Sequence, residues 1–449
     1  MFNSSLRLGV ILVTLFGFGL GLRCALVQNG NGTIANGNVT VANGMVIVSS
    51  GGIQERCSSA ALDAVTGAIV VTGIASSVDS SANFLAASVL SNGALNTAFG
   101  GGIVVTNVSA SKRTLANWSR ACAVQPDGKV LSGGSCEYLA SGIVTHGFAL
   151  VRYNSNGALD KTFNQGGIVT TSFSSAAWLK AMVLQSDGEI VVTGSLLGDI
   201  DKVITARYTA SGQLDSTFGS GGTVITTIPN ESANARVIAL QSDGSIVVGA
   251  NLVSSVNMAL IRYTANGNLD TSFGNGGTAT FSVAGVRGST LRDIVVDPAD
   301  DSIIIAGNSS DGVSDDLTLV RFMAGGMLDT TFGDGDGYIR EDFGSTRRSS
   351  ASSVALQNDG KIVVCGGAPN GNLLVARFDT HGALDRAGST SPGFGRNGQG
   401  YAEDFPNCTA TGHSVLVQSD GKIVVAGLAS SIGIGIVRYN PDGTPDTSF

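Results

Sequence analysis

The sequence is poor in charged residues, and the charge that it carries is mainly negative. Only 13% of its 449 residues are charged, about half the usual share, so Ser, Thr, Asn and Gly must cover much of the surface. The formal net charge is −8, and no block of basic residues stands out beyond Arg347 and Arg348. Neutralisation of phosphates supplies most of the affinity of nucleic-acid-binding proteins. An acidic chain without a basic face therefore predicts that nucleic acid is not a partner.

The usual signatures of catalytic and metal sites are also missing. The six cysteines show no CxxC spacing, and neither HExxH nor GxSxG occurs; these patterns mark zinc sites and nucleophilic serines. The three histidines, His146, His381 and His413, lie in different parts of the chain. We therefore predict no catalytic residues, no metal ligands and no cofactor. Spacing alone does not exclude a catalytic site assembled from distant parts of the fold.

One stretch is similar to a calcium-binding loop. FGDGDGYIRED contains the carboxylates of Asp334, Asp336 and Glu341 at closely spaced positions, and calcium takes oxygen ligands from such loops. The stretch aligns with FGNGG segments elsewhere in the chain. We therefore interpret it as an ordinary turn.

Long apolar runs are absent except near the first residue. Arg7 precedes an apolar stretch over residues 8–22, after which the chain becomes polar. This is the layout of a secretory signal peptide, and the stretch is short for a bilayer-spanning helix. We predict a signal peptide over residues 1–25 and a single domain over residues 26–449 that is secreted, periplasmic or at the cell surface, with no membrane span. The cleavage point is open, as is an uncleaved anchor; Arg23 argues against a lipoprotein anchor on Cys24.

What the chain has in abundance is glycine, with 63 residues, and one pattern that occurs seven times. Its landmarks are a hairpin phrase such as QSDGKIVVAG, then VRYNSNG, then LDTSFG. The hairpin phrases begin at Asp63, Gln125, Gln185, Gln241, Asp297, Gln357 and Gln418. A glycine precedes the Asp position of the third landmark by three residues, at Gly93, Gly157, Gly212, Gly267, Gly326, Gly382 and Gly443. These glycines are 55 to 64 residues apart, and such self-similarity indicates a repeat architecture.

Each repeat has the pattern of β-structure. Asp-Gly between apolar runs favours a type I′ hairpin turn, and the β-branched run after it is typical of a strand buried on both faces. In the repeat that contains Gly267, we expect strands near residues 223–227, 236–240, 245–250 and 258–263. Four antiparallel strands in each of seven repeats predict an all-β fold, a seven-bladed β-propeller. A parallel β-helix is the alternative, but its shorter rungs would not need a hairpin in every repeat.

The phrases SDGKIVVAG, VRYNPDG and LDTSFGNGG resemble those of the bacterial delta-60 repeat family, a propeller-like repeat of extracytoplasmic proteins. The resemblance covers nearly all of the chain after the leader. It implies a propeller fold and a location outside the cytoplasm, and it brings no catalytic residues with it.

An Arg and an Asp eight residues apart recur in all repeats but the first, as in Arg262 and Asp270. In the first repeat both positions change together, to Ser88 and Asn96. The joint change predicts that the two side chains touch, because the guanidinium fork suits a carboxylate. We interpret the pair as an ion pair that ties a strand to the following turn. A ring of arginines that binds a ligand is the alternative.

An aromatic residue follows each of the seven glycines. It is Phe99, Phe163, Phe218, Phe273, Phe332, Phe394 or Phe449. We interpret these side chains as packing anchors between repeats, with a ligand platform as the alternative. The sixth repeat has six extra residues between Asp385 and Phe394, and inserted loops often lie on a binding face.

The two ends of the array complement each other. The chain stops at Phe449, before the strand expected after that phrase, and the first repeat is preceded by an extra strand-like stretch. If the array is circular, residues 45–48 supply the missing strand and the segment 30–50 closes the ring. Cys57 and Cys408 then become neighbours; a disulfide between them and two free thiols are both open.

These patterns predict a secreted or cell-surface binding or scaffold module without enzymatic activity, monomeric, with an unidentified protein or glycan as partner. The alternative is an extracellular propeller hydrolase or lyase that acts on a polymer. Acidic or histidine residues unique to single repeats, meeting at one mouth of the ring, would favour that alternative. Fold alone does not decide between them, so the function must lie where the repeats differ.

Overall fold

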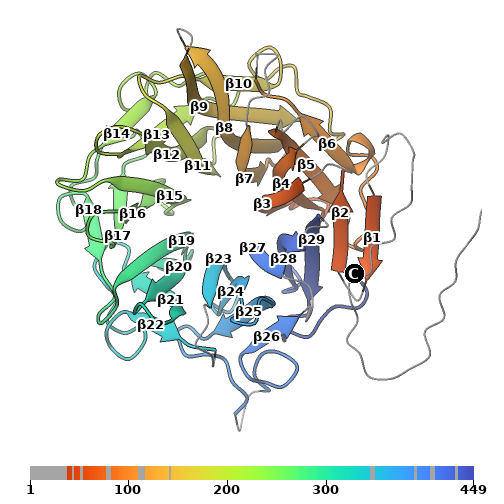
Figure 1. Cartoon of the computed structure of the whole chain (residues 1–449), viewed down its shortest axis with the longest axis vertical. Helices are drawn as coiled ribbons and strands as arrows, with labels where there is room; N and C mark the ends of the chain where they lie inside the picture. The colour runs from red at the N-terminus through yellow and green to blue at the C-terminus, as the bar shows by residue number, and fades with distance from the viewer. Residues whose placement is uncertain are drawn as a thin grey trace, which may run out of the picture.

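Seven antiparallel β-sheets stand around a common centre as the blades of a propeller (Figure 1). The computed structural model describes residues 38–42, 45–50, 54–76, 82–109, 117–140, 143–343, 349–388, 392–404, 410–429 and 433–449. The seven-bladed all-β architecture is therefore confirmed. The predicted signal peptide, Arg347, Arg348 and Cys408 lie outside the described residues. Within the described chain, no helix combines the length and the apolar character needed to cross a bilayer.

The strands of each blade follow one another from the innermost to the outermost. Blade 1 is β3 (Gln54–Leu62), β4 (Ile69–Ser76), β5 (Ala82–Val89) and β6 (Ile103–Thr106), preceded by the short helix η1 (Gly100–Gly102). Blade 2 is β7 (Trp118–Val124), β8 (Val130–Ala140), β9 (Ile143–Tyr153) and β10 (Ile168–Thr171). Blade 3 is β11 (Ala177–Leu184), β12 (Ile190–Leu196), β13 (Lys202–Tyr208) and β14 (Thr223–Thr226). Blade 4 is β15 (Ala233–Leu240), β16 (Ile246–Leu252), β17 (Met258–Tyr263) and β18 (Thr278–Phe281).

The remaining blades follow the same order. Blade 5 is β19 (Gly288–Val296), β20 (Ile303–Ser310), β21 (Asp315–Phe322) and β22 (Tyr338–Glu341). Blade 6 is β23 (Ser350–Leu356), β24 (Ile362–Gly367), β25 (Leu373–Phe378) and β26 (Tyr401–Asp404). Blade 7 is β27 (Ala410–Val417), β28 (Ile423–Ala429) and β29 (Ile434–Tyr439), completed by β2 (Met45–Ser49) and β1 (Asn38–Ala42).

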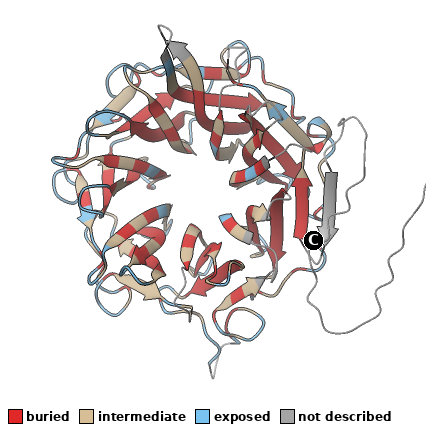
Figure 2. Ribbon diagram, in the orientation of Figure 1, coloured by how far each residue is buried: buried red, intermediate tan, exposed pale blue. Residues whose placement is uncertain are grey.

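The strands lie close to the predicted positions, but their grouping is shifted by one. The four strands expected in the repeat of Gly267 correspond to β14, β15, β16 and β17. β14 pairs with β13 and is therefore the outermost strand of the preceding blade. The second strand of each blade carries the β-branched phrase; β12, for example, is buried along its whole length. Packing of each sheet against both neighbouring blades explains why these strands are apolar on both faces (Figure 2).

The Asp-Gly hairpin turns are not of the predicted type I′. Gly128 has a φ of +77°, but Asp127 is not among the residues with positive φ. The Gly128 amide donates to the Gln125 carbonyl at 2.9 Å, and the Gln125 amide donates to the Lys129 carbonyl at 2.8 Å. This is the pattern of a longer loop in which a type I turn precedes a left-handed glycine. The predicted hairpin is confirmed, but the predicted turn type is wrong. A type I′ turn needs two residues with positive φ, and here only the glycine has one.

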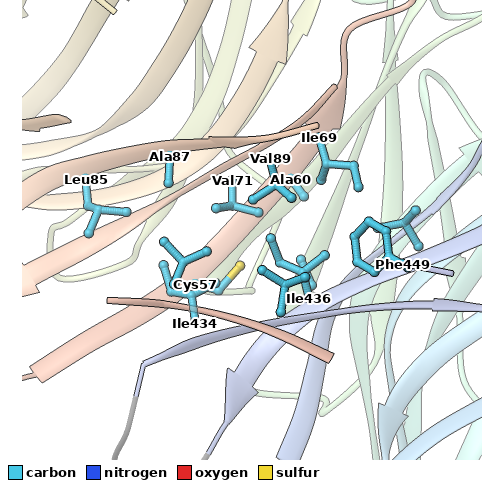
Figure 3. Packing of buried hydrophobic residues seen from close by; sticks show 14 of the residues in the cluster. Cys57, Ala60, Ile69, Val71, Leu85, Ala87, Val89, Ile434, Ile436 and Phe449 are labelled. Atoms are coloured by element: carbon cyan, nitrogen blue, oxygen red, sulfur yellow. The ribbon is translucent and has the colours of Figure 1, made fainter. Parts of the chain in front are cut away.

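Strand β2 closes the ring. It lies antiparallel to β29, with Met45 opposite Val437 and Val48 opposite Ile434, so N-terminal residues complete the C-terminal blade (Figure 1). Val46 and Val48 are fully buried. They share one hydrophobic cluster with side chains of blade 1 and of β29 and with Phe449 (Figure 3). The first and last repeats are thereby joined as neighbouring blades.

Candidate functional site

The repeated Arg and Asp side chains are in contact, as the sequence predicted. In all six pairs the Arg Nε lies 2.6–2.8 Å from an Asp Oδ2. The pairs are Arg152 and Asp160, Arg207 and Asp215, Arg262 and Asp270, Arg321 and Asp329, Arg377 and Asp385, and Arg438 and Asp446. In the first repeat Asn96 donates instead to the Ser88 hydroxyl at 3.1 Å. The joint change therefore preserves a contact.

Each of these arginines also joins its repeat to the next. Arg207 and Arg262 donate from Nη1 to the carbonyls of Ala265 and Ala324, both at 2.8 Å. Arg438 donates in the same way to the carbonyl of Ser91, which links the last repeat to the first. The guanidinium groups also lie 4.4–5.0 Å from the centres of the repeated Phe rings, within the range of cation–π attraction. These arginines are thus occupied by protein partners and serve as framework.

The electrostatics of the pairs support the same conclusion. Burial alone would raise the pKa of Asp160, but hydrogen bonds from Thr162 and the positive charges of Arg152 and Lys129 lower it to about 2. Asp160 therefore remains a carboxylate at neutral pH and can accept the bonds that fix the turn.

The repeated Phe side chains pack between blades. Phe218 is fully buried, and a Cβ added at Gly267, in the next repeat, would lie 2.8 Å from its ring. Phe163 and Gly212 are related in the same way, at 2.7 Å. The third landmark therefore has a glycine because the Phe ring of the preceding repeat leaves no room for a side chain at this position. This confirms the interpretation of the Phe residues as packing anchors.

The other residues singled out by the sequence do not come together as a site. Asp334 and Asp336 are exposed in a turn, and the Glu341 carboxylate pairs with Arg386 at 3.0 Å. The described residues contain no group of three or more side chains able to hold a metal ion. Cys57 is a buried free thiol, and its proposed partner Cys408 lies outside the described residues. Cys365 is fully buried, as expected for a residue used as a small apolar side chain.

The innermost strands carry a feature that the sequence analysis missed. In every blade, the register between the first and second strands slips by one residue, so one residue of the innermost strand is left unpaired in a β-bulge. This residue is always five positions before the hairpin phrase. The bulged residues are Ser58, Arg120, Lys180, Arg236, Arg292, Ser352 and His413. Four of the seven are thus Arg or Lys, and a fifth is His.

A glycine in the second strand makes the bulge possible in most blades. A Cβ added at Gly134 would lie 1.9 Å from the Trp118 carbonyl oxygen, and one added at Gly194 would lie 2.1 Å from that of Trp178. A side chain there would collide with the bulged strand. The KIVVAG-like phrases therefore end in glycine because this position lies against the backbone of the bulged strand. Blade 4 is the exception, with Ala250 at this position.

The basic side chains of the bulges project towards the axis of the propeller. Besides the loss of hydration, the charges of Arg120 and Arg236 lower the pKa of Lys180, to about 8. After burial, Arg120, Arg292 and Arg56 lower the pKa of His413. His413 is on blade 7, whereas Arg120 and Arg292 are on blades 2 and 5, and Arg236 on blade 4 also interacts with Arg120. Because these blades are not neighbours, the charges interact across the centre of the ring. Arg56, Arg120, Lys180, Arg236, Arg292 and His413 are called the axial basic cluster below.

The axial basic cluster has no acidic partner. In the described part of the chain, none of its members forms an ion pair or a side-chain hydrogen bond. The nearest carboxylates in sequence are used elsewhere: Glu55 accepts from the Ser50 amide at 2.5 Å, and Asp293 accepts from the Val354 amide at 2.9 Å. All members except Lys180, which is half-buried, are exposed, and exposed segments of the innermost strands are visible at the centre of the ring (Figure 2).

Arg120 and Arg236 show that exposure and crowding coexist at the axis. Their side chains are exposed by surface area, yet loss of hydration is the first cause of their lowered pKa, followed by repulsion from neighbouring arginines. The guanidinium groups are thus accessible to solvent and at the same time partly dehydrated. A cluster of like charges without counter-charge destabilises a fold and at the same time attracts anions. The axial basic cluster is therefore the candidate functional site.

The substitution Arg236→Ser is expected to raise the melting temperature by about 1–2 °C. It removes repulsion from Arg292 and Arg120, and Ser58 and Ser352 show that serine fits the same bulge position. Thermal unfolding at low ionic strength measures the effect, because salt screens it.

Lys161→Ser is the matched control for this substitution, since it removes one positive charge from an exposed position outside the cluster. In a chain of net charge −8, loss of a cation should be neutral or slightly destabilising. A melting temperature of the Arg236→Ser variant equal to or below that of the control would show that the cluster is not under repulsion.

The comparisons with known proteins agree with the fold. The family model described as a domain of unknown function (DUF5122) beta-propeller matches residues 125–163, 185–218, 241–273, 299–332, 357–387 and 418–449. Each match ends at or near the third landmark, and the first repeat, which lacks the Arg–Asp pair, is not matched. No curated protein matches the chain.

Several solved structures are similar to this chain at low sequence identity, each with a TM-score below 0.5. A polysaccharide lyase of family PL25, an ulvan lyase bound to -[GlcA(1-4)Rha3S]-, has a TM-score of 0.49 and 9% identity, covering 87% of this chain and 95% of that chain. A protein of unknown function from Dyadobacter fermentans DSM 18053 has a TM-score of 0.45 and 8% identity, covering 86% and 95%. The periplasmic gluconolactonase PpgL of Pseudomonas aeruginosa has a TM-score of 0.44 and 13% identity, covering 73% and 82%. Likenesses this distant say nothing of function.

Proposed function

We propose that this seven-bladed propeller, six of whose repeats match the DUF5122 beta-propeller model, is a non-enzymatic binding or scaffold module that holds a negatively charged partner at its axis. The partner is a protein or a carbohydrate that presents carboxylate, sulfate or phosphate groups. The site residues are the axial basic cluster.

One observation carries this proposal: basic side chains occupy the same bulge position in blades 2, 3, 4 and 5, and among the described residues no carboxylate forms an ion pair with them. Arginine and lysine donate several hydrogen bonds to oxyanions, and arginine can do so through two parallel bonds. Their placement on the innermost strands, which pack on one another around the ring, holds the donors on a rigid support. Rigid support lowers the entropy lost on binding.

The proposed location is outside the cytoplasm. It rests on the signal-peptide pattern over residues 1–25 and on the resemblance to the bacterial delta-60 repeat family. The mature protein over residues 26–449 would then act as a secreted, periplasmic or cell-surface monomer without a membrane span. An anionic surface polymer or an acidic protein would be accessible to it there.

The proposal predicts measurable binding of anions that depends on the axial cations. Titration calorimetry with sulfate, dextran sulfate and oligogalacturonate should show binding that weakens as salt is added. The triple substitution Arg120→Ser, Arg236→Ser and Arg292→Ser should weaken it at least tenfold, since each lost charged hydrogen bond costs about 1.5–3 kcal/mol. Neutral dextran should not bind.

A control with the same change in net charge separates the site from general electrostatics. Lys161→Ser, Lys202→Ser and Arg287→Ser remove three positive charges outside the axial cluster. Equal weakening in the two triple variants, or no binding of any anion by the unaltered protein, would overturn the proposal.

The alternative is an extracellular hydrolase or lyase that acts on a polymer. One observation favours it: Lys180, with a pKa lowered to about 8, can exchange a proton near neutral pH, and His413, whose pKa is lowered by burial and by neighbouring arginines, is a neutral base there. Among the seven bulged residues, Lys180 is the only lysine and His413 the only histidine. Turnover of oligogalacturonate or of a sulfated polysaccharide, lost in Lys180→Gln or His413→Gln, would replace the binding function by this one.

A further inference from the structure

The two tryptophans of the chain, Trp118 and Trp178, are stacked on each other next to the axial basic cluster. Their ring centres are 4.6 Å apart and their planes differ by 19°. They occupy equivalent positions in neighbouring blades, each two residues before the bulged cation of its innermost strand. The equivalent residues in the other blades are Arg56, Asn234, Thr290, Ser350 and Thr411. The aromatic pair is thus a property of blades 2 and 3 and is no part of the repeated framework.

A histidine and a glutamate hold this pair in place. The His146 ring lies 4.0 Å from that of Trp178, and His146 Nε2 is 3.2 Å from the Glu137 carboxylate. Glu137 and His146 face each other across β8 and β9, whose 11 residues each make them the longest strands described. This extended hairpin supports the indoles from the side of blade 2. A ring fixed by its neighbours loses little freedom when a ligand stacks on it.

The indoles are half-buried, and they lie within reach of the same ligand as the cations. Lys180 Nζ is 6.0 Å from the centre of the Trp178 ring, and Lys180 is electrostatically coupled to Arg120 and Arg236. The site therefore offers an apolar aromatic surface next to several positive charges. A complementary ligand has a flat apolar face and an anionic substituent on the same unit.

We propose that Trp118 and Trp178 form a sugar-stacking subsite beside the axial basic cluster, and that the ligand is an acidic oligosaccharide. The C–H face of one sugar ring lies against the aromatic surface, whose negative π-face attracts the weakly positive C–H groups. The carboxylate or sulfate of that sugar or of its neighbour reaches the cations. This inference rests on the proposed binding function and names its ligand class.

Single-stranded nucleic acid also combines stacking rings with negative charge, but the arrangement of the cations disfavours it. Binding of a strand uses a positively charged groove that follows the backbone over several nucleotides. Here the cations of the axial basic cluster gather around one axis and form no extended groove, and the chain as a whole has a net charge of −8. A compact acidic sugar unit matches this geometry better than an extended polyphosphate.

Intrinsic fluorescence tests the proposal directly, because the chain contains only two tryptophans. Oligogalacturonate or a sulfated oligosaccharide should change the emission on binding, and sulfate should bind with a smaller change. Trp118→Leu and Trp178→Leu, each with one remaining reporter, should weaken oligosaccharide binding about tenfold and leave sulfate affinity within twofold. Phe343→Leu, in a ring pair with Tyr401 at 4.9 Å elsewhere in the fold, is the matched control and should change neither.

Each outcome decides one question. If sulfate and the oligosaccharides both fail to bind, the proposed binding function fails with the subsite. If the anions bind but both Trp variants, shown to be folded by circular dichroism, bind the oligosaccharides as tightly as the unaltered protein, only the subsite is overturned. Tighter binding of a single-stranded oligonucleotide than of every acidic oligosaccharide would also overturn it.

Discussion

Deletion of residues 1–50 is expected to lower the melting temperature by more than 10 °C or to prevent folding. The deletion removes β2, whose Met45, Val46, Ile47 and Val48 are all buried and which pairs with β29. Burial of four such side chains contributes on the order of 6–12 kcal/mol, which is comparable with the total stability of most domains. Thermal and urea unfolding of the purified protein measure the loss.

Deletion of residues 1–37 is the control, because it ends before β1 and leaves the closing strands intact. It should change the melting temperature little. Val46→Asp gives a second test without deletion, since Val46 is fully buried in the cluster that joins blades 7 and 1. Equal stability of the two deletion variants would mean that the ring does not depend on β2.

Arg262→Ala is expected to cost about 3 kcal/mol of unfolding free energy, and the double change Arg262→Ser with Asp270→Asn clearly less. Both side chains are largely buried, with 12% and 19% exposure. The single change leaves the Asp270 carboxylate without its guanidinium and removes the Arg262 bond to the Ala324 carbonyl of the next repeat. The double change installs the pair that the first repeat already uses, Ser88 and Asn96. Urea unfolding of both variants at pH 7 gives the comparison.

The pH dependence of the stability difference between the unaltered protein and the double variant provides the control. Hydrogen bonding from Ser272, followed by bonding from Arg262, lowers the pKa of Asp270. The stabilisation that belongs to the ionised pair is therefore complete above the unfolded pKa of about 3.9 and is lost as the pH falls below it. The unaltered protein should lose its advantage over the double variant below pH 4. Identical unfolding free energies for the single and double variants at pH 7 would show that the contact contributes nothing specific.

The local features of this fold could be predicted because they are properties of adjacent residues. The β-branched phrases mark the second strand of each blade, and the joint change to Ser88 and Asn96 correctly indicated a contact between side chains eight residues apart. The turn type was wrong for an equally local reason: Asp-Gly is compatible with more than one hairpin loop, and only Gly128 is left-handed. The sequence pattern alone does not distinguish these loops.

The axial basic cluster was missed because its members are about one repeat apart in sequence. Arg120 and Arg236, for example, each stand alone on a strand, and no stretch of the described chain looks basic. The exclusion of nucleic acid was argued from net charge and from the lack of basic blocks, which does not reveal charges gathered at an axis. A signal was nevertheless present: alignment on the hairpin phrases places Ser58, Arg120, Lys180, Arg236, Arg292, Ser352 and His413 in one column. Five of the seven residues in that column are basic.

By itself, the sequence determined the number of blades, the buried strands, and the Arg, Asp and Phe framework that joins each repeat to the next. These depend on hydrogen bonds and apolar contacts whose partners lie within one repeat or in the repeat that follows. The tertiary structure decided that the bulged side chains face one another and that two tryptophans from neighbouring blades stack beside them. Electrostatic repulsion and ring stacking depend on distance in space, which is set by the packing of neighbouring blades and by closure of the ring through β2 and β29.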